Sequence, residues 1–177
     1  MHSLCIIFTR THTVVGSLIR KVLGGRYNHC SIVLDNDFSR LYSFSRYYTK
    51  FWFTGCFCIE TIGKLSFGKE CIQGAIAEIQ ITDREYKGIC KFLSGMSHGI
   101  HVYNYINACL IPFRLSIDSN KSYICSTFVA KILSYIDEVT LDKKFSLYKP
   151  MELYDLLKDS IIFEGNLYDC LRDRSVM

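Results

Sequence analysis

Cys125 is the residue whose type and position best suit it to nucleophilic chemistry. It opens a stretch, Cys125–Ile136, in which apolar residues recur at the spacing of an amphipathic helix. A thiol attacks only as the thiolate, and a helix start supplies partial positive charge and free backbone N–H groups. These groups lower the thiol pKa and can hold an oxyanion. We therefore expect Cys125 to act as a nucleophile.

A base for this thiol has to come from the five histidines. His29 begins a predicted strand and shares its face with Ser31 and Val33, so its ring can point from a sheet toward a packed helix. An imidazole there could form a thiolate–imidazolium pair with Cys125. A structural histidine is the alternative at this position. The remaining four lie at the chain end or in predicted loops: His2, His12, His98 and His101.

The elements that would position this pair follow from apolar periodicity and from turn residues. Strands are predicted at Leu4–Thr9, His29–Leu34, Leu41–Ser45, Ile72–Ile81 and Ile161–Phe163. Helices are predicted at Thr13–Leu23, from Thr82 to the glycines near Gly95 and Gly99, and at Val102–Leu110, Cys125–Ile136 and Met151–Leu157. Residues 47–70 show no clear period. A hairpin loop at Asp35–Arg40 should bring residues near Ser43 opposite residues near His29.

Composition predicts one globular domain over residues 1–177. The chain is 49% hydrophobic with only 2 prolines, and its net charge of +4 comes from dispersed residues, so no nucleic-acid arm is expected. The apolar start of the chain lacks the features of a signal peptide. No apolar run approaches the ~20 residues of a transmembrane helix. We expect a cytoplasmic protein without a transmembrane segment.

The nine cysteines are expected to be reduced thiols, most of them small core residues. Cys56 and Cys58 form the one close pair, but their spacing is not that of a zinc site and no second pair follows at a suitable distance. The sequence has no phosphate-binding glycine loop, no dinucleotide fingerprint and no HExxH motif. We therefore expect neither a metal nor another cofactor.

Three motifs resemble the circularly permuted branch of the NlpC/P60 papain-like superfamily. They are Tyr27–Asp35, Leu41–Arg46 and Tyr123–Ala130. Ile6–Thr11 and Gly55–Glu60 also resemble uncharacterised bacterial members of the YycO/YiiX-like group. The resemblance implies an α+β, papain-like fold, with a central antiparallel sheet packed against the helix that carries Cys125. It also implies that Cys125 is the nucleophile and His29 the base of a thiol protease or amidase.

The third catalytic residue is less well defined by the resemblance. Related enzymes place a polar residue on the strand after the histidine strand, and the nearest match is Ser43. A serine hydroxyl can accept an imidazole N–H, but it lacks the charge of a carboxylate. Glu60 matches a glutamate of the YycO/YiiX-like group and has no assigned role. Tyr123 could line the oxyanion site, with burial beside the helix start as the alternative.

Hydrolysis of an amide or related acyl bond through an acyl-enzyme is the leading functional hypothesis. The expected substrate is a peptide, an isopeptide or a lipid amide, and aromatic residues at 47–53 could wall its groove or pack on the core. Transfer of the same thioester to an amine or alcohol is a second hypothesis. The third is an inactive binding module, which the serine at position 43 favours. The substrate and the oligomeric state stay open at this stage.

Overall fold

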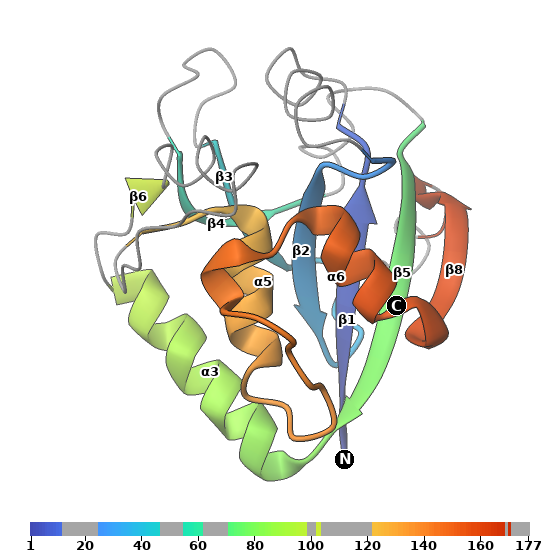
Figure 1. Ribbon diagram of the computed structural model, residues 1–177. Coiled ribbons are helices and arrows are strands. Elements are labelled where there is room, and N and C mark those ends of the chain that lie inside the picture. Colours follow the sequence, from blue (N-terminus) through green and yellow to red (C-terminus); the bar gives the residue numbers. More distant parts are fainter. Residues whose placement is uncertain are drawn as a thin grey trace.

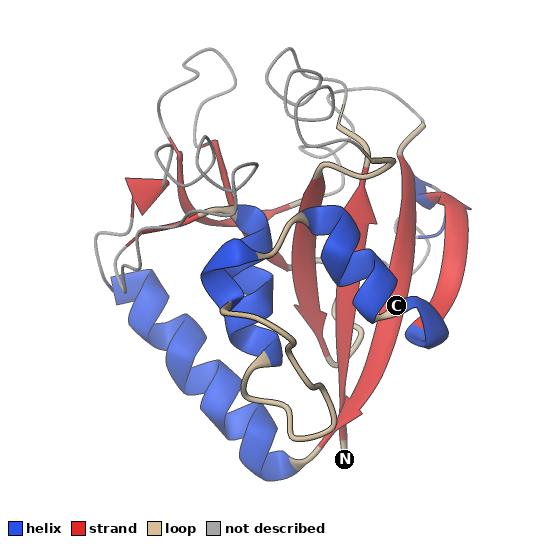
Figure 2. Cartoon of the chain, viewed as in Figure 1, coloured by secondary structure: helices blue, strands red, loops and turns tan. Residues whose placement is uncertain are grey.

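The chain forms an α+β structure built on one mixed sheet (Figures 1 and 2). The computed structural model describes residues 1–11, 25–46, 55–61, 71–98, 102–103, 122–168 and 170. The strands are β1 (His2–Thr9), β2 (His29–Leu34), β3 (Leu41–Arg46), β4 (Gly55–Glu60), β5 (Gln73–Ile81), β6 (Val102–Tyr103), β7 (Ser122–Tyr123) and β8 (Ile161–Asn166). Their order is β7-β6-β4-β3-β2-β1-β5-β8, and neighbours are antiparallel except for the β6–β7 pair.

Helices of the described part cover one face of this sheet. They are α3 (Asp83–His98), α5 (Cys125–Leu133) and α6 (Pro150–Leu156), with short 3-10 turns at η2 (Phe145–Leu147) and η3 (Lys158–Ser160). Figure 1 shows α5 lying between α3 and α6 over the middle of the sheet. Every residue of α5 except Lys131 is buried, because the helix is enclosed by the sheet and its neighbouring helices. The start of α5 is therefore held firmly against the strands.

Apolar side chains pack on both faces of the sheet because inward and outward positions alternate along each strand. On the helix side, Phe8, Ile32 and Phe44 join Phe128 and Ile132 of α5 in the larger cluster. On the other side, a smaller cluster contains Cys5, Ile7, Val33, Phe38, Leu41, Ile72, Ile76 and Leu167. The central strands β1 and β2 are thus buried on both faces.

The sheet opens between β2 and β3 at the end where His29 lies. β1 and β2 pair over six register positions, from Leu4–Leu34 to Thr9–His29. By contrast, pairing of β2 with β3 is limited to Ile32 and Tyr42. In Figure 1 the β3–β4 pair diverges from β2, and the start of α5 lies between them. This opening gives the helix start access to side chains from both halves of the sheet.

Most of the predicted elements are confirmed. β2 has the predicted bounds, β8 lies at the sheet edge, and α5 starts at Cys125. The end of α5 differs, because residues 134–136 form tighter turns such as Ile136 N–H to Leu133 O. The helix predicted at Val102–Leu110 is wrong at its start, since Val102 pairs with Cys56 in the sheet. β4 was not predicted, and the helix predicted at 13–23 lies outside the described residues, as do residues 104–110.

The first turn of α3 is capped by a reciprocal pair of hydrogen bonds between Thr82 and Glu85. Thr82 Oγ1 accepts from the Glu85 N–H at 3.3 Å, and Glu85 Oε2 accepts from the Thr82 N–H at 2.7 Å. Glu85 Oε1 also accepts from the backbone N–H of Asp137 at 2.8 Å, which ties the helix start to the loop after α5. The hydrogen bond that the Thr82 hydroxyl donates to the Glu85 carboxylate, together with those from the backbone N–H groups of Asp137 and Thr82, lowers the pKa of Glu85.

We predict that Glu85→Ala lowers the free energy of unfolding by about 1–2 kcal/mol, because it removes one cap and leaves a backbone N–H unpaired. Urea denaturation followed by circular dichroism measures this loss. Lys87→Ala, an exposed change on the same helix, is the matched control and should be close to neutral. Equal stability of the two variants would contradict the capping role.

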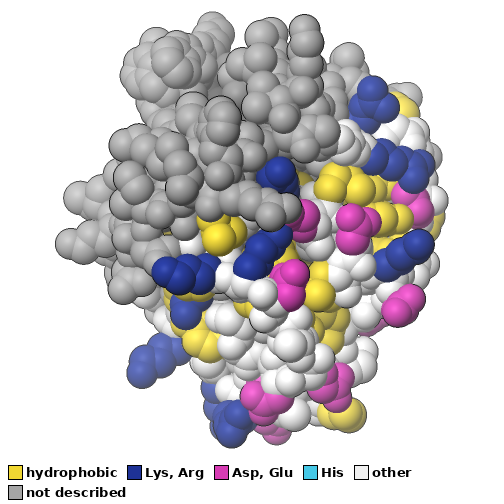
Figure 3. Space-filling view, viewed as in Figure 1, with side chains coloured by type: hydrophobic (Ala, Val, Ile, Leu, Met, Phe, Trp, Pro, Cys, Tyr) yellow, Lys and Arg dark blue, Asp and Glu magenta, His cyan; other side chains and the backbone are white. Residues whose placement is uncertain are grey.

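The surface in Figure 3 carries basic and acidic side chains side by side over the described part of that face. Neither sign gathers there into a continuous patch. Among the described residues, no helix combines the length and the apolar character needed to cross a membrane.

Candidate functional site

Cys125 lies at the first position of α5, where backbone donors are free. The preceding residue, Ile124, is extended (φ −110°, ψ 169°), and its apolar side chain cannot cap the helix. Thr127 Oγ1 instead accepts from the N–H of Ile124 at 3.0 Å. Among the described residues, no side chain caps the helix start from Ile124. The N–H groups of the first turn are positioned to stabilise negative charge on the thiol or on a bound oxygen.

His29 connects this thiol to a carboxylate. The side chains of His29 and Cys125 interact through a hydrogen bond, and the two residues are only 8% and 6% exposed. Nε2 of His29 donates to Oε2 of Glu60 at 2.9 Å, which leaves Nδ1 for Cys125. Burial alone would lower the pKa of His29, but the charge of Glu60 and the bond with Cys125 outweigh it. The pKa of His29 therefore lies well above its usual value.

The neighbours of Cys125 also shift the pKa of its thiol. A hydrogen bond from the Cys30 thiol lowers the pKa of Cys125, and the hydrogen bond and charge of His29 lower it further against the opposing effect of burial. The result is a pKa well below the usual value. The pKa of His29 is raised at the same time, so both shifts favour the thiolate–imidazolium form of the pair.

Glu60, at the end of β4, is the side chain that orients His29. It is 3% exposed, and its carboxylate also accepts from Ser43 Oγ at 2.7 Å. Burial would raise the pKa of Glu60, but the charge of His29 and hydrogen bonds from His29, Ser43 and Ser45 lower it to about 2. The site thus contains a buried carboxylate that is ionised at neutral pH.

In this arrangement His29 contacts Glu60, and Ser43, the third residue suggested by the sequence, also contacts Glu60. Ser43 is fully buried, and its hydroxyl donates to Glu60. Glu60 and Ser43 lie on the same face of adjacent strands, since Leu41 pairs with Glu60 and Ser43 with Cys58. The longer glutamate side chain spans the opening to His29, and the short serine holds the glutamate.

Sequence reasoning noted Glu60 from the family resemblance but gave it no role. β4 shows no alternation of polar and apolar residues, because Cys56, Phe57, Cys58 and Ile59 are all apolar. The available signal was a single carboxylate at the end of that apolar run. A charged residue there has to be paired when it is buried.

Tyr123, proposed as an oxyanion ligand with core packing as the alternative, lies in the core. Its ring packs at 5.4 Å from Phe44 and 6.2 Å from Phe92, and 2% of the residue is exposed. Burial, together with the nearby Tyr135, raises the pKa of its hydroxyl. These contacts account for Tyr123 as a packing residue.

The other histidines are placed away from the pair or are not described. His2 stacks on Tyr86 with ring centroids 3.8 Å apart, and its Nδ1 contacts Asp35. His12, His101 and the aromatic stretch 47–53 lie outside the described residues.

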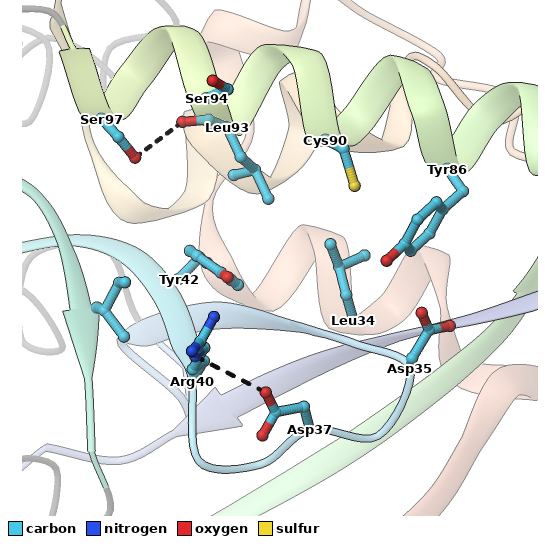
Figure 4. Close-up of a pocket in the computed structure, with 11 residues that line it drawn as sticks. Leu34, Asp35, Asp37, Arg40, Tyr42, Tyr86, Cys90, Leu93, Ser94 and Ser97 are labelled. Atoms are coloured by element: carbon cyan, nitrogen blue, oxygen red, sulfur yellow. Dashed lines mark hydrogen bonds and ion pairs between the residues drawn. The ribbon is translucent and has the colours of Figure 1, made fainter.

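A separate cavity of about 560 Å³ lies between α3 and the β2–β3 hairpin (Figure 4). Its walls include Tyr86, Cys90 and Leu93 of α3, with Leu34 and Tyr42 from the strands. Leu34 ends β2 whereas His29 begins it, a separation of about 17 Å at ~3.3 Å per residue. The cavity is therefore distinct from the Cys125 site.

Fold and site together define an α+β protein with a buried thiol–imidazole–carboxylate array. Comparisons of the sequence with protein-family models, curated proteins and solved structures give no match. In the described part of the chain, no three His, Cys, Asp or Glu side chains are grouped as metal ligands would be. The function must be argued from the chemistry of the array itself.

Proposed function

We propose that this protein is a cysteine hydrolase that cleaves an amide or related acyl bond through an acyl-enzyme. One observation carries the proposal. A continuous series of contacts joins the Cys125 thiol to His29 and His29 to the buried Glu60 carboxylate, at the start of an uncapped helix. This is the set of groups that thiol acyl transfer needs: a thiolate, a base with a fixed tautomer, and oxyanion donors.

Each group has a defined task in this mechanism. The Cys125 thiolate attacks the carbonyl carbon, and N–H groups at the start of α5 stabilise the tetrahedral oxyanion. Protonated His29 then gives its proton to the leaving amine, which leaves a thioester on Cys125. Neutral His29 next removes a proton from water, and the resulting hydroxide releases the acid. Glu60 holds His29 in place and stabilises its charged form.

A papain-like fold of the permuted NlpC/P60 type is part of this proposal. The order of its motifs agrees with the observed strands, because β2 with His29 precedes α5 with Cys125. We propose a peptide, isopeptide or lipid amide as the substrate class. Glu60 weakens the argument for an inactive binding module, since that argument depended on a serine as the third residue.

The test is the alkylation of each cysteine by iodoacetamide between pH 5 and 9, measured by mass spectrometry. We predict that Cys125 reacts at least about tenfold faster than the buried reference thiol Cys5 at pH 6, because the interactions with Cys30 and His29 that lower the pKa of Cys125 favour the reactive thiolate. His29→Ala should abolish this difference. His2→Ala is the matched control, since His2 also contacts a carboxylate, Asp35, but lies outside the site.

Alkylation of Cys125 at the rate of Cys5 at pH 6 would contradict the proposal. If Cys125 is activated, incubation with acyl thioesters and amides, with and without an amine acceptor, separates hydrolysis from acyl transfer by the products formed. Release of the free acid in both conditions supports hydrolysis.

A further inference from the structure

A second thiol, Cys30, lies directly beside the nucleophile. It follows His29 in β2 and belongs to the same buried cluster as Cys125. The two side chains are hydrogen-bonded to each other, and the backbone N–H of Cys30 also donates to the Cys125 sulfur. The mechanism proposed above does not require this second thiol.

Strand geometry explains how Cys30 reaches Cys125. The N–H of Asp35 donates to Ser3 O across the β1–β2 pair, so the odd-numbered residues of β2 direct their N–H groups toward β1. Even-numbered residues, including Cys30, direct theirs toward β3. Pairing with β3 is limited to Ile32 and Tyr42, so the N–H of Cys30 faces the opening that the start of α5 occupies.

The two thiols are in different chemical states. Burial, together with the neighbouring Cys125 charge, raises the pKa of Cys30, whereas the pKa of Cys125 is lowered. Cys125 is therefore the thiol that ionises more readily, and Cys30 is the one that stays protonated beside it. This combination is typical of a peroxide-reactive cysteine and its resolving partner.

We propose that Cys30 and Cys125 form a reversible disulfide when a hydroperoxide oxidises Cys125, so that the site is a peroxide-sensitive modification site. The proposal rests on the same Cys125 thiolate as the proposed hydrolase. The disulfide would block the nucleophile and so stop hydrolysis. It would also protect Cys125 from irreversible oxidation to the sulfinic and sulfonic acids.

The chemistry balances in two steps. The Cys125 thiolate attacks one oxygen of the hydroperoxide, the O–O bond breaks, and the leaving alkoxide or hydroxide takes a proton from His29. This gives the sulfenic acid of Cys125 and an alcohol or water. The Cys30 thiol then attacks that sulfur, forming the disulfide and releasing water. Overall, two thiols lose two electrons and the peroxide gains them.

The test treats the full chain with a small excess of hydrogen peroxide, blocks free thiols with iodoacetamide and maps the tryptic peptides. The expected product is a Cys30–Cys125 cross-linked peptide that dithiothreitol removes. In Cys30→Ser the cross-link should be absent, and Cys125 should instead accumulate as sulfinic and sulfonic acid. Cys5→Ser is the matched control, a buried thiol of the opposite cluster, and should cross-link like the parent.

If Cys30 is still reduced after peroxide treatment of the parent protein, the proposal is overturned, whatever the oxidation state of Cys125. That outcome differs from failure of the proposed function, which is measured on the reduced protein by the alkylation profile. If Cys125 is activated but no cross-link forms, the hydrolase proposal stands and the disulfide proposal is rejected. The parent result does not depend on any variant folding correctly.

Discussion

Replacing Glu60 by Gln should lower the alkylation rate of Cys125 at pH 6 by about 100-fold. A large loss is expected because Glu60 orients His29 and stabilises its protonated form. The Glu60 charge opposes burial in keeping His29 protonated. Without that charge, burial favours the neutral imidazole, which no longer attracts the thiolate. The pKa of Cys125 then rises and less thiolate is present at pH 6.

The control for this variant is Glu78→Gln. Glu78 Oε1 accepts from Ser3 Oγ at 2.7 Å, as Glu60 Oε2 accepts from Ser43 Oγ at 2.7 Å, but Glu78 lies on β5 away from the site. Glu78→Gln should keep the parent alkylation profile. If both variants react like the parent, Glu60 has only a structural role. Thermal unfolding of each variant verifies that it is folded at the assay temperature.

The second large effect is a loss of stability in acid that depends on Glu60. The pKa of Glu60 falls from 4.5 to about 2 on folding, so its contribution is present above pH 4.5 and is lost as the pH falls toward 2. A shift of this size corresponds to about 3 kcal/mol, of which about 2 kcal/mol should be lost by pH 3. Burial of the carboxylate supports a full contribution, because solvent screening is small there.

Urea denaturation at pH 6, 5, 4 and 3 measures this effect. The reference is the double variant Glu60→Gln/His29→Gln, because Glu60→Gln alone leaves a buried neutral His29 whose own protonation would destabilise the fold in acid. The parent should lose about 2 kcal/mol more than the double variant between pH 6 and 3. Glu78→Gln should follow the parent curve. Parallel curves for the parent and the double variant would show that the carboxylate is not held ionised by the fold.

The contribution of His29 to folding stability depends on pH in the opposite sense to that of Glu60. Its pKa is raised on folding, so the stability from its charged form is fully present below the unfolded value of 6.5 and is lost as the pH rises through the folded pKa. The Glu60–His29 pair is therefore most stabilising between about pH 4.5 and 6.5. Any alkylation assay of the activated thiol should include this interval.

The local parts of the site could be predicted from the sequence. The apolar stripe after Cys125 specifies a helix that starts there, and the run from His29 to Leu34 specifies a strand with the observed bounds. Both patterns depend on neighbours within a few positions in the chain. The elements that carry Cys125 and His29 are therefore encoded by short-range patterns.

Only the tertiary structure shows which groups surround the pair. Glu60 meets His29 because β2 and β3 separate beyond Ile32–Tyr42, and Cys30 meets Cys125 because the start of α5 enters that opening. Neither contact leaves a periodic pattern in the sequence, since each joins side chains from strands or helices far apart in the chain. The sequence by itself therefore determined the helix that starts at Cys125 and the strand that starts at His29, and the opening of the sheet decided which side chains surround these two residues.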